Sequence, residues 1–252
     1  MLLLPVVLYA ALFLYALFLS DSAIFLPHPS SYKDTAEIVK LTTANGNKIP
    51  AIYLTNPSAR FTLLVSHGNA EDLGDCRDWL ESLRESGFNL LAYDYEGYGT
   101  SEGKPGEKHA YQDEEAAYDY LVTALKVSPD RIIIFGRSVG TGPAVHLAAR
   151  RPAAGLILQS PFLSAFRVVI PIPILPFDKF PNYKDIRRVH CPVLIMHGTA
   201  DEVISFWHGA KLYDLANSPK QSFWVEHAGH NNFEQVAGER YIKTIQNFGL
   251  SL

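Results

Sequence analysis

Three residues of the sequence each follow an apolar, strand-like run. Together their side chains are a serine hydroxyl and the two groups that can activate it. Ser138 lies in the pentapeptide GRSVG after the run IIIF, Asp201 follows VLIMHG, and His230 follows FWV. A serine hydroxyl is a weak nucleophile unless a histidine takes its proton and a carboxylate orients that histidine. We therefore predict Ser138 as the nucleophile, Asp201 as the orienting acid and His230 as the base.

The pentapeptide at 136–140 has the form G-x-S-x-G and opens an alanine-rich helical stretch. Small glycines on both sides of a serine allow a sharp strand-to-helix turn that lifts the hydroxyl above the end of the sheet. The helix N-terminus beneath it favours developing negative charge. The alternative is an ordinary glycine-rich bend without catalytic use.

Other assignments of the acid and of the histidines are possible from the residues. Glu202 is an alternative to Asp201, which is preferred because it lies nearer the strand end. His227 and His230 form a conceivable metal pair, but the sequence offers no third ligand at a plausible helical spacing. We predict no metal and no cofactor.

The turn after the run FTLLV is the expected place for an oxyanion hole. The segment SHGNAED, residues 66–72, supplies one backbone N–H, and the residue after the nucleophile supplies the other. We predict the N–H groups of Asn69 and Val139, with Ala70 as the alternative to Asn69. A simple strand-to-helix turn is the rival interpretation.

The predicted elements bring these loops together. From residue 61 onwards short β-branched runs alternate with amphipathic helical stretches, which indicates an α/β architecture with a mostly parallel, doubly wound sheet. Strands are predicted at 61–68, 89–95, 131–136, 154–160, 192–198 and 222–228, and helices at 75–87, 113–125, 138–151, 206–217 and 232–248. An antiparallel hairpin at 36–43 and 48–55 would form the N-terminal edge. Loops at the carboxyl ends of parallel strands lie at one edge of the sheet, where the three predicted residues can converge.

The first 19 residues carry no charge and would span roughly 28 Å as a helix, close to the hydrocarbon thickness of a bilayer. We predict a single-pass, transmembrane N-terminal anchor at 1–20, a linker at 21–34 and a catalytic domain at 35–252. A cleaved signal peptide and a buried core helix are the alternatives. Five prolines in residues 161–185 predict an irregular cap after the sixth strand.

Composition excludes one class of partner. The 252-residue chain has a net charge of −4, so it offers no general attraction for polyanions, and nucleic acid is not an expected partner. Its two cysteines are too few for a disulfide framework and lack the spacing of a zinc site.

Six ordered motifs resemble one known family. They are SHGNAEDLGD, AYDYEGYGTSEGKPGE, IIIFGRSVGTGPAVHLAAR, PFDKFPNYKDI, VLIMHGTADEVISFWHG and WVEHAGHNNF. Together, from about residue 30 to the C-terminus, they are similar to the α/β-hydrolase domain-containing family, in the branch of protein depalmitoylases and their bacterial relatives. The resemblance implies the α/β-hydrolase fold and the same roles for Ser138, Asp201 and His230. The chain departs from the mammalian depalmitoylases, because its first 19 residues contain no cysteine.

The expected activity is that of a membrane-tethered serine hydrolase acting on acyl esters or thioesters. Phe162 and Ile172 in the cap would line an acyl channel, and Tyr98 would form another rim of the site. The cap side chains could instead pack on the domain or rest on a membrane surface. A serine peptidase, a small-ester carboxylesterase and a catalytically silent binding scaffold are the alternative functions.

Overall fold

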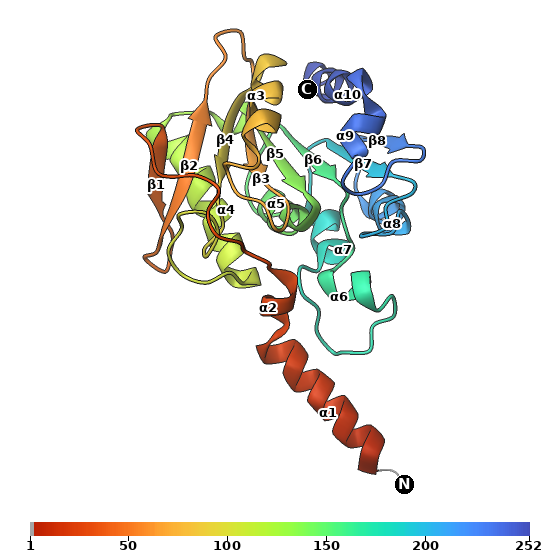
Figure 1. Ribbon diagram of the computed structural model, residues 1–252. Helices are drawn as coiled ribbons and strands as arrows, with labels where there is room; N and C mark the ends of the chain where they lie inside the picture. Colours follow the sequence, from red (N-terminus) through yellow and green to blue (C-terminus); the bar gives the residue numbers. More distant parts are fainter. Residues whose placement is uncertain (1–2) are drawn as a thin grey trace.

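The computed structural model describes residues 3–252 and is built around one twisted sheet of eight strands (Figure 1). The strands are β1 Ile38–Thr42, β2 Lys48–Leu54, β3 Thr62–Ser66, β4 Asn89–Tyr93, β5 Ile132–Arg137, β6 Gly155–Gln159, β7 Val193–Gly198 and β8 Lys220–Val225. Their spatial order is β1-β2-β4-β3-β5-β6-β7-β8. β1 pairs with β2, and β2 with β4, in antiparallel register, whereas every other neighbouring pair is parallel. The predicted parallel sheet with an antiparallel N-terminal edge is confirmed.

Helices cover both faces of the sheet. The helices of residues 3–252 are α1 Leu3–Phe18, α2 Ser20–Ile24, α3 Arg77–Glu85, α4 Glu107–Asp119, α5 Thr141–Ala148, α6 Ala165–Val169, α7 Asn182–Asp185, α8 Trp207–Leu215, α9 Phe233–Ala237 and α10 Glu239–Leu250, of which α1, α2 and α6 lie below the sheet in Figure 1. Shorter turns are η1 Tyr120–Ala124, η2 Pro129–Arg131, η3 Ser138–Gly140 and η4 Ile186–Arg188. Figure 1 shows α3 and α10 on one side of the sheet and α4 and α5 on the other.

Alternating strand residues supply the two cores. Leu64 and Ile134 point to the face covered by α4, α5 and α8, while their neighbours Leu63 and Ile133 point to the face covered by α3, α9 and α10. Successive side chains of a strand point to opposite faces, so strands buried on both faces are apolar throughout. The central strands are therefore fixed in the molecule, and the loops at their ends start from rigid positions.

One predicted helix is two in the structure. The stretch 232–248 divides into α9 and α10 at Gly238, whose φ is 57°. Glycine adopts positive φ without the steric cost that other residues meet, and this lets the chain change direction between the helices. The apolar periodicity on either side of Gly238 continues across the break, which is why the pattern alone predicts a single helix.

The predicted membrane-spanning helix at the N-terminus is not supported. Its first two residues lie outside the described part, and α1 ends at Phe18, where Leu19 leaves helical geometry before α2 begins. Sixteen residues of helix extend about 24 Å, short of a hydrocarbon core of about 30 Å. Among residues 3–252, none of the helices combines the length and apolar character needed to cross a membrane.

The segment after α1, predicted as a linker at 21–34, packs on the catalytic domain. Phe25 is buried, with its ring edge-on to Tyr98 and Phe180. The hydroxyl of Tyr32 donates a hydrogen bond to Asp94 over 2.5 Å. The segment is thus a part of the folded domain.

The cap at 161–185 is irregular, as its prolines predict, and contains only the short helices α6 and α7. It contacts the N-terminal helices directly. The ring of Phe13 meets that of Phe177 edge-on at 5.4 Å, and Lys179 Nζ lies 2.9 Å from Asp21 Oδ1. Cap and N-terminal helices therefore form one structural unit below the sheet in Figure 1.

Candidate active site

The turn between β5 and α5 holds Ser138 in a strained backbone conformation. Its φ is 52°, a left-handed value that side-chain-bearing residues rarely adopt. A β-carbon at Gly136 would lie 2.6 Å from the carbonyl oxygen of Gly140. One at Gly140 would lie 2.6 Å from the carbonyl oxygen of His67 and would also overlap that of Ser66. Gly136 thus lets the turn close on the start of α5, and Gly140 lets it lie against the end of β3.

The structure brings the three predicted side chains into one hydrogen-bonded row. Ser138 Oγ lies 2.9 Å from His230 Nε2, and His230 Nδ1 lies 2.8 Å from Asp201 Oδ2. Because an ionised carboxylate can only accept, the proton of a neutral His230 belongs on Nδ1, and Nε2 accepts from the serine hydroxyl. This arrangement can move a proton from the serine to the imidazole.

Asp201 is held firmly on its other side. Its Oδ1 accepts the backbone N–H groups of Val203 and Ile204 over 3.0 and 2.7 Å. Burial alone would raise the pKa of Asp201, but hydrogen bonds from His197 and His230 outweigh it and hold that pKa well below its usual range. The carboxyl group is therefore ionised at neutral pH and can stabilise positive charge on His230.

Glu202 and His227, the alternatives from the sequence, have other contacts. Glu202 Oε2 accepts the backbone N–H of His230 over 3.2 Å and so supports the loop, whereas the imidazole bonds to Asp201. The backbone N–H of His227 donates to Thr199 Oγ1. The two ring nitrogens of His230 already make hydrogen bonds with Ser138 and Asp201. Neither nitrogen is therefore free to bind a metal shared with His227.

The predicted oxyanion donors lie near Ser138, in the wall of one cavity. Asn69 and Val139 both line it. The Asn69 side chain is locked, because its Oδ1 accepts from Tyr98 Oη over 2.6 Å and its Nδ2 donates to Ile24 O over 2.7 Å. These side-chain hydrogen bonds hold the loop that carries Asn69 in place. The role of the Asn69 backbone N–H as an oxyanion donor stays a prediction.

This cavity has a volume of about 580 Å³, and Ser138 and His230 open into it. Much of its wall is apolar, with Ile204 on the loop after β7 and Phe162 and Val168 on the cap. Hereafter it is the catalytic cavity. An acyl group bound to Ser138 would lie against hydrocarbon.

Two predicted substrate contacts are placed elsewhere. Tyr98 is only 1% exposed and lies behind Asn69, outside the cavity wall, because its hydroxyl is used to bind the Asn69 side chain. Ile172 is 66% exposed and lines a neighbouring cavity beside α1. Of the three predicted contacts, Phe162 is the one in the catalytic cavity.

Sequence reasoning missed the contribution of the N-terminal segment. Ala23, Ile24 and Leu26 line the catalytic cavity, and the Leu26 N–H donates to both Asn69 Oδ1 and Tyr98 Oη over 2.9 Å. The sequence feature that could have indicated this contribution is the apolar run AIFL, which lies inside a stretch otherwise rich in serine and proline. His197 was missed as well. Its Nε2 lies 3.3 Å from Asp201 Oδ2, and the histidine is fully buried.

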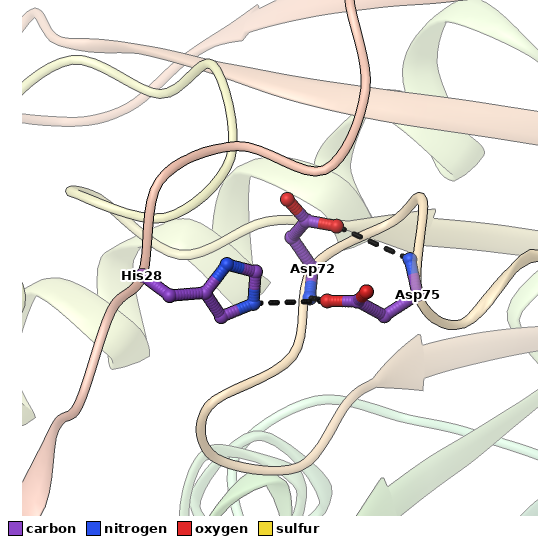
Figure 2. A group of neighbouring side chains, drawn as sticks. All are labelled: His28, Asp72 and Asp75. Atoms are coloured by element: carbon purple, nitrogen blue, oxygen red, sulfur yellow. Dashed lines mark hydrogen bonds and ion pairs between the residues drawn. The ribbon is translucent and has the colours of Figure 1, made fainter.

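A group with metal-ligand chemistry lies near the site. Among residues 3–252, His28, Asp72 and Asp75 are the one set of three potential ligands within 4.8 Å of one another. Figure 2 shows His28 directed at Asp75, 2.9 Å away, while Asp72 accepts the Asp75 backbone N–H. Asp72 also accepts from Ser31 and from the Gly74 N–H. These hydrogen bonds fasten the N-terminal segment to the loop after β3.

Comparison with known proteins defines the class. Residues 57–177 match the family described as serine aminopeptidase, S33. The chain is 43% identical over 225 residues to human α/β-hydrolase domain-containing protein 17B, covering 88% of this chain and 77% of that protein. It is 42% identical over 219 residues to mouse α/β-hydrolase domain-containing protein 17C, covering 85% of this chain and 68% of that protein.

A solved esterase from Pyrococcus furiosus shares the fold, with a TM-score of 0.74 over 88% of this chain and 98% of that one, at 19% identity. The molecule is a serine hydrolase with the α/β-hydrolase fold. The predicted resemblance to the α/β-hydrolase domain-containing family is confirmed by the identity to proteins 17B and 17C over most of the chain. The chain belongs to the α/β-hydrolase domain-containing family.

Replacing Asp201 tests the hydrogen-bonded row. In Asp201→Asn the carbonyl oxygen would stay with the N–H groups of Val203 and Ile204, and the new NH₂ would face His230. The imidazole would then carry its proton on the wrong nitrogen, so we expect kcat for ester hydrolysis to fall about 10³–10⁴-fold. Steady-state hydrolysis of a p-nitrophenyl ester measures this.

Glu202→Gln is the matched control, because glutamine keeps an oxygen to accept the His230 backbone N–H. We expect it to stay within about threefold of wild type. Equal losses in the two variants would contradict the assignment of Asp201.

Proposed function

We propose that the chain hydrolyses acyl esters or thioesters through a covalent acyl-enzyme on Ser138, with His230 as base and Asp201 as orienting acid. One observation carries the proposal. The hydrogen-bonded row from Ser138 Oγ to Asp201 opens into a cavity with a largely apolar wall, which suits the acyl part of a substrate.

The steps follow from the contacts. His230 Nε2 takes the proton of Ser138 Oγ as that oxygen bonds to the acyl carbon. The backbone N–H groups of Val139 and Asn69 stabilise the oxyanion. The leaving alcohol or thiol receives the proton from His230 as its bond to the acyl carbon breaks. Water then attacks the acyl-enzyme by the same route, releasing the acid and restoring the serine.

The wall of the catalytic cavity supports an acyl substrate over an aminopeptidase substrate. An aminopeptidase must bind a free α-ammonium group, which calls for an available carboxylate. Among residues 3–252, Glu71 supplies the one carboxylate in this wall, and it already accepts the Gly68 N–H over 2.6 Å and faces Arg137 at 3.7 Å. The resemblance to protein depalmitoylases makes S-acyl cysteine thioesters one of the expected substrate classes.

Covalent labelling tests the nucleophile. We expect a fluorophosphonate probe to modify Ser138 in the wild type, because the row holds its hydroxyl beside a base. In Ser138→Ala, labelling disappears and kcat falls about 10⁴-fold or more. Peptide mapping of the labelled protein and steady-state ester hydrolysis measure the two effects. A folded wild type that stays unlabelled would favour the catalytically silent scaffold instead.

We also propose that α1 attaches the protein to a membrane. Leu3–Phe18 contains no charged residue, and α1 exposes large apolar side chains on more than one side. These are Leu4, Val6, Val7, Leu8, Tyr9, Leu14, Tyr15, Leu17 and Phe18. A helix that is apolar all round is stable only when surrounded by protein or lipid. Each large side chain that enters hydrocarbon contributes about 1.5–3 kcal/mol.

Vesicle flotation tests the attachment. We expect the full chain to float with phosphatidylcholine vesicles, and Leu4→Glu/Leu8→Glu to bind at least about tenfold less, because two glutamates resist entry into hydrocarbon. Leu250→Glu is the control, since Leu250 is also exposed but lies at the C-terminus, away from α1. A wild type that stays unbound, or a double variant that binds as well as wild type, would contradict the proposal.

A further inference from the structure

A second cavity lies between the N-terminal helices and the cap, with a volume of about 250 Å³. We call it the N-terminal cavity. One wall comes from α1 and α2, including Leu12, Ala16 and Ala23, and the other from the cap, including Ile170 and Leu175. These walls are far apart in sequence, and Figure 1 shows α2 beside the cap, below the sheet.

The N-terminal cavity adjoins the catalytic cavity. Ala23 and Ile24 of α2, with Ala165 and Val169 of α6, line both. These four residues form the boundary between the two cavities, and two of them are alanines, whose small side chains obstruct it least. A chain attached at Ser138 would enter the N-terminal cavity at this boundary, between α2 and α6.

The lining is chemically suited to hydrocarbon. Ser20 Oγ donates a hydrogen bond to Ala16 O over 2.6 Å, so the hydroxyl proton needs no acceptor from a ligand. The charged side chains of Arg167 and Asp178 lie 3.4 Å apart and compensate each other. The remaining lining is almost entirely aliphatic and aromatic. A ligand there would meet a mainly apolar surface.

Three contacts hold the two walls at a fixed spacing. The Tyr9 hydroxyl donates to Ile174 O over 3.2 Å, and the rings of Phe13 and Phe177 meet at 5.4 Å. Lys179 Nζ pairs with Asp21 Oδ1 at 2.9 Å. A cavity with fixed walls can discriminate between ligands by length.

We propose that the N-terminal cavity is the subsite for the distal part of the substrate's acyl chain, so that α1 and α2 set the chain-length preference of the enzyme. The inference rests on the proposed acyl hydrolysis at Ser138. A methylene group needs about as much room as a water molecule, roughly 30 Å³. The 250 Å³ of the N-terminal cavity are thus large enough for several methylenes beyond those held in the catalytic cavity.

The test is a comparison of acyl-chain profiles. For the full chain, kcat/KM is measured with butyryl, octanoyl and palmitoyl p-nitrophenyl esters and with the matching S-acyl thioesters. Ala16→Phe fills the N-terminal cavity without touching the catalytic one, since Ala16 lines only the former. We expect its ratio of palmitoyl to butyryl kcat/KM to fall at least tenfold, in both the ester and the thioester series.

Two further variants complete the design. Ala23→Trp places a large ring at the boundary between the two cavities. It should lower the ratio of palmitoyl to butyryl kcat/KM at least tenfold. Ala11→Trp adds the same side chain at an exposed position of α1 that lines neither cavity, and should keep the wild-type ratio.

The outcomes separate the two proposals. A wild-type ratio in Ala16→Phe, or a wild type that hydrolyses butyryl but not palmitoyl substrates, would overturn the chain subsite and leave the hydrolase standing. A folded wild type with no Ser138-dependent hydrolysis of any chain length would overturn the proposed function itself.

Discussion

The site depends on one close approach of two backbones. At Gly140 the turn after β5 lies against the carbonyl groups of Ser66 and His67 at the end of β3, with no room for a side chain. That contact fixes the turn in which Ser138 keeps a positive φ, and it places the serine beside the loop that carries Asn69. Parallel strands β7 and β8 then bring Asp201 and His230 to the same edge of the sheet.

Sequence patterns predicted the parts of the molecule that follow from local rules. Apolar strands alternating with helices indicate a parallel sheet, and Ser138, Asp201 and His230 were found because each follows such a strand. Contacts between distant segments were harder to predict. Tyr98 looked like a rim residue, yet its hydroxyl binds Asn69, and neither composition nor periodicity identifies such a partner.

The N-terminal segment shows the same limit more clearly. Hydropathy measures how strongly a stretch avoids water, and it does not distinguish lipid from an apolar protein surface. In the structure α1 places Phe13 against the cap, and Phe25 enters the core beside Tyr98. One segment thus contributes to the catalytic domain, to a cavity beside the site and to an exposed apolar surface. The proposed chain-length selection and the proposed membrane attachment would therefore involve the same helices.

The most direct measurement of the account is the capture of the acyl-enzyme. Wild-type protein is mixed with p-nitrophenyl palmitate, quenched in acid within the first turnover, digested and analysed by mass spectrometry. The account predicts one palmitoyl group on the peptide that contains Ser138 and none in Ser138→Ala. A palmitoyl group on another residue, or hydrolysis by the wild type without any acylated peptide, would contradict it.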